Sequence, residues 1–168
     1  IDLGDELILS ILSTPASSEL DSILWSTQGL DSCQNCSSIT VTPTQQTTYT
    51  VLVDEGGCSA SDDLTVVVKK DRPVYVPNAF SPNDDGLNDI FTIYAGKSVV
   101  SIKSFLVFDR WGETMYEQYN FVPNDPLVGW NGRFREQRMQ SAVFTWFAEI
   151  EFTDGRVELY KGSVNLVR

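Results

Sequence analysis

The strongest pattern in the chain is a strict alternation of apolar and polar side chains from Ala142 to Phe152. Every second position there carries an apolar side chain that would face a core: Phe144, Trp146, Ala148, Ile150 and Phe152. A period of two is typical of a β-strand with one buried face. Asp154 and Gly155 separate this strand from a second strand-like run, residues 157–167, and an Asp-Gly pair in that position predicts a β-hairpin.

Shorter runs rich in β-branched residues predict further strands. Residues 101–108 are apolar on both faces, which is typical of a strand covered on both sides. Five more runs, divided by clusters of Gly, Pro, Asp and Ser, lie at residues 7–12, 22–25, 38–41, 48–53 and 64–68. No segment has the periodicity of a three-turn amphipathic helix, and residues 122–129 form an irregular loop in this interpretation. The pattern therefore predicts an all-β fold.

The charged residues 69–72, followed by Pro73, mark a boundary between two groups of strands. Residues 1–70 contain ten acids and two bases, a net charge of −8, whereas residues 71–168 contain thirteen acids and ten bases, a net charge of −3. We therefore expect two β-sandwich, immunoglobulin-like modules in tandem, one over residues 1–70 and the other over residues 73–168.

Composition excludes several functions. The net charge of −11 repels nucleic acid and anionic lipid surfaces. The chain has no histidine, so it lacks the commonest general base and the commonest transition-metal ligand, and we expect neither an enzyme nor a metal centre. It has no apolar run of membrane-spanning length and no signal peptide at its start, so we expect no membrane insertion. Without an initiator Met, it is expected to be part of a longer protein.

The segment 82–89 is rich in side-chain oxygens around Gly86, and its candidate residues are Asn83, Asp85, Asn88 and Asp89. Such oxygens are the ligands that calcium prefers, but an EF-hand frame aligned on Gly86 places Thr92 where a bidentate Glu is needed. The favoured interpretation is a tight turn whose Asn and Asp side chains accept backbone N–H groups. Calcium remains the alternative, and we expect no other cofactor.

Other motifs follow strand-like runs. Asp109-Arg110-Trp111-Gly112 predicts a turn in which Asp109 accepts backbone N–H groups and Arg110 stacks on an aromatic ring. The tripeptide Trp130-Asn131-Gly132 precedes a basic cluster, Arg133, Arg135 and Arg138, which is expected at a solvated hairpin edge. The chain finishes on Leu166-Val167-Arg168. Arg168 is expected to be an exposed charge with little effect on stability.

The order of these motifs over about residues 73–168 resembles the gliding-motility-associated C-terminal domain, the type B sorting domain of the type 9 secretion system of Bacteroidota. Asn131 stands where that family usually has Asp, and Ala142 and Phe144 replace its usual Gly and Tyr. The resemblance implies export through the periplasm to the cell surface or extracellular space. It implies that the secretion machinery, especially PorP/SprF-type outer-membrane proteins, is the partner, and that the upstream cargo is a large surface protein such as a gliding adhesin.

The resemblance also suggests partner-binding residues: Asn83, Asp85, Asn88, Asp89, Arg110, Trp111, Trp130, Leu166 and Arg168. The final strand is the candidate docking edge, because strand addition to a free sheet edge tolerates sequence variation. The alternative function is a glycan-binding or adhesive module in which Trp111 and Trp130 form a stacking platform. Exposed rings would favour glycan binding, and buried rings would favour sorting.

The first module resembles the immunoglobulin-like, PKD-like repeats of Bacteroidota surface proteins, which are usually spacers. Trp25 and Tyr49 are expected to pack in its core. Three cysteines fall one ligand short of a closed zinc site. In a secreted setting we expect a Cys33–Cys36 disulfide, with Cys58 packed as a small apolar side chain, although other pairings remain open.

Overall fold

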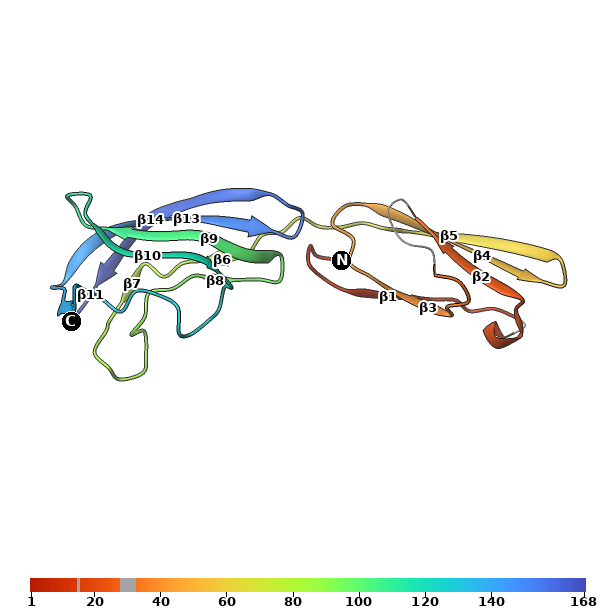
Figure 1. The fold of residues 1–168 in the computed structure, drawn as a ribbon, viewed down its shortest axis with the longest axis horizontal. Helices are drawn as coiled ribbons and strands as arrows, with labels where there is room; N and C mark the ends of the chain where they lie inside the picture. Colours follow the sequence, from red (N-terminus) through yellow and green to blue (C-terminus); the bar gives the residue numbers. More distant parts are fainter. Residues whose placement is uncertain (15, 28–32) are drawn as a thin grey trace. The chain divides into compact units, whose positions relative to one another are not determined.

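The computed structural model describes residues 1–14, 16–27 and 33–168, and these residues form an all-β protein (Figure 1). One 3₁₀ turn, η1 (Ser17–Glu19), interrupts the described strands. None of the described segments is a helix long and apolar enough to cross a membrane. The chain divides into two compact units, Ile1–Lys70 and Asp71–Arg168.

The strands of the first unit form two sheets around a small apolar core. A two-stranded sheet pairs β1 with β3, and a three-stranded sheet has the order β2-β4-β5, all antiparallel. The bounds are β1 (Leu7–Ser10), β2 (Ser22–Ser26), β3 (Ser38–Val41), β4 (Thr47–Glu55) and β5 (Cys58–Val66). Trp25 and Tyr49 lie in this core, which confirms their predicted packing role.

Two features of the first unit differ from the sequence-based expectation. β5 begins at Cys58, well before residue 64, because a tight turn at Gly56 and Gly57 lets Cys58 pair with Glu55 at the end of β4. Cys58 is therefore exposed on an edge strand, so the prediction that its thiol packs as a small apolar group is wrong. A disulfide joins Cys33 to Cys36, and both residues pack against the core.

The second unit is built on one five-stranded sheet with the order β10-β9-β13-β14-β7. Its strands are β7 (Ala79–Phe80), β9 (Val99–Phe108), β10 (Thr114–Phe121), β13 (Ala142–Phe152) and β14 (Val157–Leu166). Neighbouring strands are antiparallel except for β14 and β7, which run parallel over two residue pairs. The predicted hairpin at Asp154 and Gly155 is confirmed, because β13 and β14 pair along almost their whole length.

A thin second layer covers one face of this sheet. It consists of β6 (Val74–Tyr75) paired with β8 (Tyr94–Ala95), together with the chain segments around them. These segments supply Phe91, Ile93 and Trp130, which pack against the buried face of β13 and are at most 1% exposed. A short hairpin of β11 (Arg133–Phe134) and β12 (Gln137–Arg138) follows Trp130.

The outer face of the sheet has no second layer among the residues that the structure describes. On β9, Phe105 and Val107 are fully buried, whereas Leu106 and Phe108, which face the other way, are only half-buried. Phe108 instead stacks on Phe147 of β13, with 5.6 Å between the ring centroids. The prediction that both faces of residues 101–108 are covered is therefore wrong, because aromatic packing within the outer face takes the place of a covering layer.

Candidate functional site

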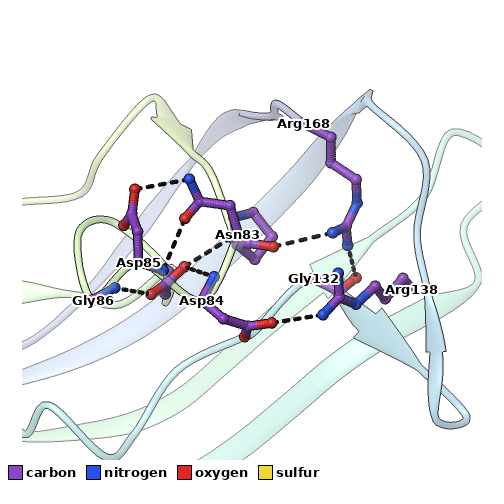
Figure 2. Close-up of polar contacts among 9 residues, drawn as sticks. Asn83, Asp84, Asp85, Gly86, Gly132, Arg138 and Arg168 are labelled. Atoms are coloured by element: carbon purple, nitrogen blue, oxygen red, sulfur yellow. Dashed lines mark hydrogen bonds and ion pairs between the residues drawn. The ribbon is translucent and has the colours of Figure 1, made fainter.

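Three segments that lie far apart in the sequence meet at one end of the second unit: the loop of residues 81–89, the β11–β12 hairpin and Arg168 (Figure 2). We call them together the end site. β7 leads directly into the loop, and β14 ends just before Arg168. Because Leu166 of β14 pairs in parallel with Phe80 of β7, the ends of these two strands lie side by side.

The carboxylate of Asp89 holds the loop together. One of its oxygens accepts the backbone N–H groups of Asn83 and Asp84 at 2.8 Å each, and the other accepts that of Gly86 at 2.7 Å. Desolvation by the loop works to raise the pKa of Asp89, but the three N–H donors outweigh it and lower the pKa below its usual value. Asp89 is thus an ionised carboxylate that organises the backbone.

The other acids and amides of the loop are also engaged within it. Asp85 accepts the side-chain N–H of Asn83 with one oxygen and the backbone N–H of Leu87 with the other, each at 2.8 Å. The backbone carbonyl of Asn88 accepts the N–H of Ser81 at 2.9 Å. These bonds form the tight turn that the sequence predicts, and they confirm that its Asn and Asp side chains accept backbone N–H groups.

The same contacts bear on how the loop could hold calcium. Thr92, in the twelfth position of the EF-hand frame, is 4% exposed and belongs to the covered face of the unit. Among the described residues, no three acids, cysteines or histidines are grouped closely enough to hold a metal ion. A calcium ion would have to compete with backbone N–H groups for the oxygens of Asp85 and Asp89. A plain turn without calcium stays the prediction, with calcium binding as its alternative.

Arg168 joins the three segments. Its guanidinium donates to the carbonyl oxygens of Pro82 at 3.0 Å and Gly132 at 3.3 Å (Figure 2). It also donates to the carbonyl oxygen of Met139 at 2.7 Å. These carbonyls belong to the residue after β12, the loop and the residue before β11. Arg168 is exposed, as expected, but its guanidinium bonds three carbonyls, because its five-donor fork spans acceptors that no shorter side chain would connect.

The β11–β12 hairpin carries the basic cluster predicted at a hairpin edge, and the structure confirms that position. Its two-residue turn, Arg135-Glu136, has φ of 48° and 67°, in the left-handed region where side chains are strained. Arg138 contacts Asp84 of the loop at 2.6 Å, and Arg135 contacts Glu113 at 3.2 Å. Asp84 is a residue that sequence analysis missed, since no local pattern indicates a partner fifty-four positions away.

The contact between Arg135 and Glu113 brings the β9–β10 turn to the edge of the end site. Asp109 accepts the backbone N–H groups of Trp111 and Glu113, both at 2.8 Å, as the sequence predicts. The guanidinium of Arg110 lies 5.2 Å from the ring centroid of Trp111, which confirms the predicted aromatic contact. Trp111 is 81% exposed, so this turn presents a cation and a flat ring to solvent.

Two of the predicted partner-binding residues lie beneath the surface. Trp130 is 1% exposed and Leu166 is 2% exposed, and both pack in the core of the unit. The expectation that a partner contacts their side chains is corrected, because the strand pattern that makes Leu166 inward-facing also removes it from solvent. Trp130 donates its indole N–H to the carbonyl of Arg133 at 2.8 Å, and this bond ties the first strand of the β11–β12 hairpin to the core.

The glycine and amide beside Trp130 also have structural reasons. Gly132 has φ of 69°, and a Cβ there would lie 2.7 Å from Pro82 and 2.9 Å from Leu166. Asn131 accepts the backbone N–H of Arg133 with its side-chain oxygen at 3.1 Å. An amide oxygen serves this bond as a carboxylate oxygen would, so the change from the family's usual Asp retains the local turn.

The electrostatics of the end site suit binding better than acid–base chemistry. A hollow of about 400 Å³ is lined by residues of the three segments, with carboxylates and guanidiniums mixed. Among the described carboxyls with a resolved shift, Asp89 and Glu151 both have a lowered pKa, the latter chiefly because Lys103 donates a hydrogen bond to it. A general acid needs the opposite, a raised carboxyl pKa.

The tryptophans distinguish between the two functions predicted from the sequence. Trp25, Trp130 and Trp146 are between 1% and 8% exposed, and Trp111 is the one tryptophan with a solvent-facing ring. A flat row of exposed rings would favour a sugar platform. The buried rings therefore favour the sorting domain over the glycan-binding module.

Comparison with known families agrees with the position of these features. The sequence profile of the CHU_C type IX secretion signal domain matches residues 74–166, which include the whole five-stranded sheet and almost all of the end site. No individually curated protein is similar enough to the chain to count as a match. Since the matched region is more than half of the chain, the chain belongs to the CHU_C type IX secretion signal domain family.

Proposed function

We propose that this chain is the sorting module of a large surface protein of the gliding-adhesin kind, and that PorP/SprF-type outer-membrane proteins receive it. As a type IX secretion signal domain, it interacts with the type IX secretion machinery and is exported to the cell surface or the extracellular space. The cargo and the receptor are the proposed parts. The family match over residues 74–166 is the observation that carries this proposal.

The end site supports recognition of a folded shape. Its loop is fixed by backbone N–H groups on Asp89, and its segments are joined by Arg168 and by the ion pair between Arg138 and Asp84. A sorting signal shared by many cargo proteins must be recognised whatever cargo domain precedes it in the chain. A rigid surface with an exposed turn at Arg110 and Trp111 meets this requirement, because little conformational entropy is lost when it binds.

We further propose that the chain has no catalytic role and that the first unit is a spacer. The sequence contains no histidine, and the two shifted carboxyl pKa values are in the direction opposite to that of a general acid. The first unit has a core of its own around Trp25 and Tyr49, so its folding does not depend on the end site.

Export of a reporter tests the proposal. A fluorescent or enzymatic reporter would be fused before Ile1 of the whole chain and, separately, before Pro73, and expressed in a bacterium with a type IX system. We expect surface display from both fusions, and loss of display from both in a strain that lacks the PorP/SprF-type protein. Display that requires the first unit would contradict the spacer role, and display that persists without the outer-membrane protein would contradict the proposed receptor.

A further inference from the structure

The five-stranded sheet of the second unit ends at β10 on one side and at the short strand β7, next to β14, on the other. β14 is bordered by β7, but this strand pairs only with Asn165 and Leu166. The chain before β7 leaves the sheet, because β6 pairs with β8 in the other layer. Within the described part of the chain, residues 157–164 of β14 therefore pair with β13 alone, and no strand borders their outward backbone N–H and C=O groups.

The opposite edge, β10, carries features that discourage strand addition. Its pairing with β9 is interrupted by a register shift at Met115, and Asn120 has φ of 52°, which bends the strand near its end. Bulges and bends of this kind keep edge strands from pairing with other chains. β10 is thus a protected edge.

β14 has none of these protections over the same length. Its ten pairs with β13 run without a register shift, and no proline interrupts the strand. Val157 and Leu159 are 54% and 62% exposed, and they lie on the outer face together with Lys161. This regular edge of eight residues, exposed on its outer face, matches the length of an ordinary strand.

A buried polar group lies beside this edge. The indole of Trp146 packs over Gly162 of β14, and its Nε1 would lie 3.2 Å from a Cβ at that position. Trp146 is 8% exposed, and its Nε1 has no hydrogen-bond partner within the described chain. A buried N–H without an acceptor is costly. The glycine at position 162 thus makes room for the indole of Trp146.

We propose that residues 157–164 of β14 are a docking edge, and that an extended strand of a protein of the type IX export machinery adds to it. This inference rests on the proposed function and names the surface by which the secretion machinery recognises the domain. The partner strand would place apolar side chains beside Val157 and Leu159 and an acidic side chain beside Lys161.

A second copy of this chain fits the edge less well. Each copy carries a net charge of −11, so two copies repel each other at the distance of paired strands. The last residues of β14, Asn165 and Leu166, pair with β7, and Arg168 bonds the loop beyond them. These residues are therefore not part of the docking surface. The sequence-based expectation of a docking edge in the final strand is thereby narrowed to its first eight residues.

Matched charge variants in the whole chain test this edge. Leu159→Lys/Ser163→Lys would place two more lysines beside Lys161 on the edge strand, whereas the control Val143→Lys/Thr145→Lys adds two lysines to the same face of the interior strand β13. All four positions are exposed, so both variants should fold. We expect surface display of an attached reporter to fall about tenfold for the edge variant and less than about twofold for the control.

The outcomes separate the two proposals. If the unaltered chain displays no reporter, the proposed function fails, and this inference fails with it. If the unaltered chain displays the reporter and the edge variant does so equally well, the docking edge alone is refuted. An equal loss in both variants would also refute it, since a general effect of charge or folding would then explain the result.

Photo-crosslinking in cells provides a second measurement that does not depend on blocking the edge. Benzoylphenylalanine would replace Lys161 on β14 or Tyr119 on β10, both of which are exposed. We expect position 161 to crosslink to a protein of the secretion machinery and position 119 to give none of that adduct. Equal adducts at both positions, or an adduct of position 161 with a second copy of the chain, would overturn the proposal.

Discussion

Removal of the Arg168 side chain should loosen the second unit as a whole. The side chain donates three hydrogen bonds to carbonyls of separate segments, two of them partly buried. A hydrogen bond from a charged donor contributes about 1.5–3 kcal/mol when buried, and solvent screening and the entropy of a long side chain reduce this value. We therefore expect Arg168→Ala to lower the free energy of unfolding by about 2 kcal/mol in total.

Two further variants show whether the geometry of the guanidinium matters. Arg168→Lys retains the charge, but an ammonium on a flexible stem cannot span three separated carbonyls, so it should restore less than half of the loss. The control is Arg156→Ala. Arg156 is also largely exposed, and its guanidinium is 3.9 Å from Asp154, so this change should alter the free energy of unfolding by less than about 0.5 kcal/mol.

Urea denaturation followed by tryptophan fluorescence is the appropriate assay. In a Trp25→Phe background the remaining tryptophans all lie in the second unit, so fluorescence reports that unit alone. A loss of about 2 kcal/mol corresponds to a midpoint shift of about 1 M urea for a domain of this size. A midpoint for Arg168→Ala equal to that of Arg156→Ala would refute the view that Arg168 fastens the end site.

Three other changes test the loop and its surroundings. In urea denaturation, Gly132→Ala should lower the free energy of unfolding by about 3 kcal/mol and Gly112→Ala by only about 1 kcal/mol. Both glycines have positive φ, but of the two only Gly132 has neighbouring atoms that a Cβ would meet. Equal losses for the two variants would contradict this explanation. The pKa of Asp89 is depressed in the folded state, so the stability it confers is fully present above its usual pKa of 3.8 and is lost as pH falls through the lower folded value. Melting temperatures of Asp89→Asn should therefore decline less steeply than those of the unaltered chain as pH falls below 3.8, and parallel declines would count against this role. Saturating calcium should leave the melting temperature unchanged, and a rise that Asp85→Ala abolishes would instead reveal a calcium site.

Elements with an unbroken period of two were predictable from the sequence. β13 was placed at its observed bounds, and β14 within a residue, because their inward side chains alternate without interruption. β10 was missed for the opposite reason. The register shift at Met115 puts a buried Met next to a half-buried Tyr116, and this removes the alternation that identifies a strand.

Local turn chemistry was also predictable, whereas contacts across the domain were not. Asp109 and the residues around Asp85 make bonds to backbone groups only a few positions away, so residue type alone indicated their roles. The roles of Asp84 and Arg168 depend on the parallel pairing of β7 with β14. These two strands lie far apart in the sequence, and no local pattern of residues predicts that they pair. Burial of Trp130 likewise depends on which layer covers the sheet.

The pairing of β7 with β14 has a consequence for timing during synthesis. Ala79 lies near the start of the second unit and Asn165 near its end, so nearly the whole unit must emerge from the ribosome before this contact can form. Arg168 adds its three bonds only after that step. A chain interrupted before Leu166 would retain β9, β10 and β13. It would lack the complete pairing of β7 with β14 and the three hydrogen bonds of Arg168. The fold thus makes formation of the end site depend on synthesis of the chain as far as Arg168, and chains that terminate before Leu166 do not acquire it.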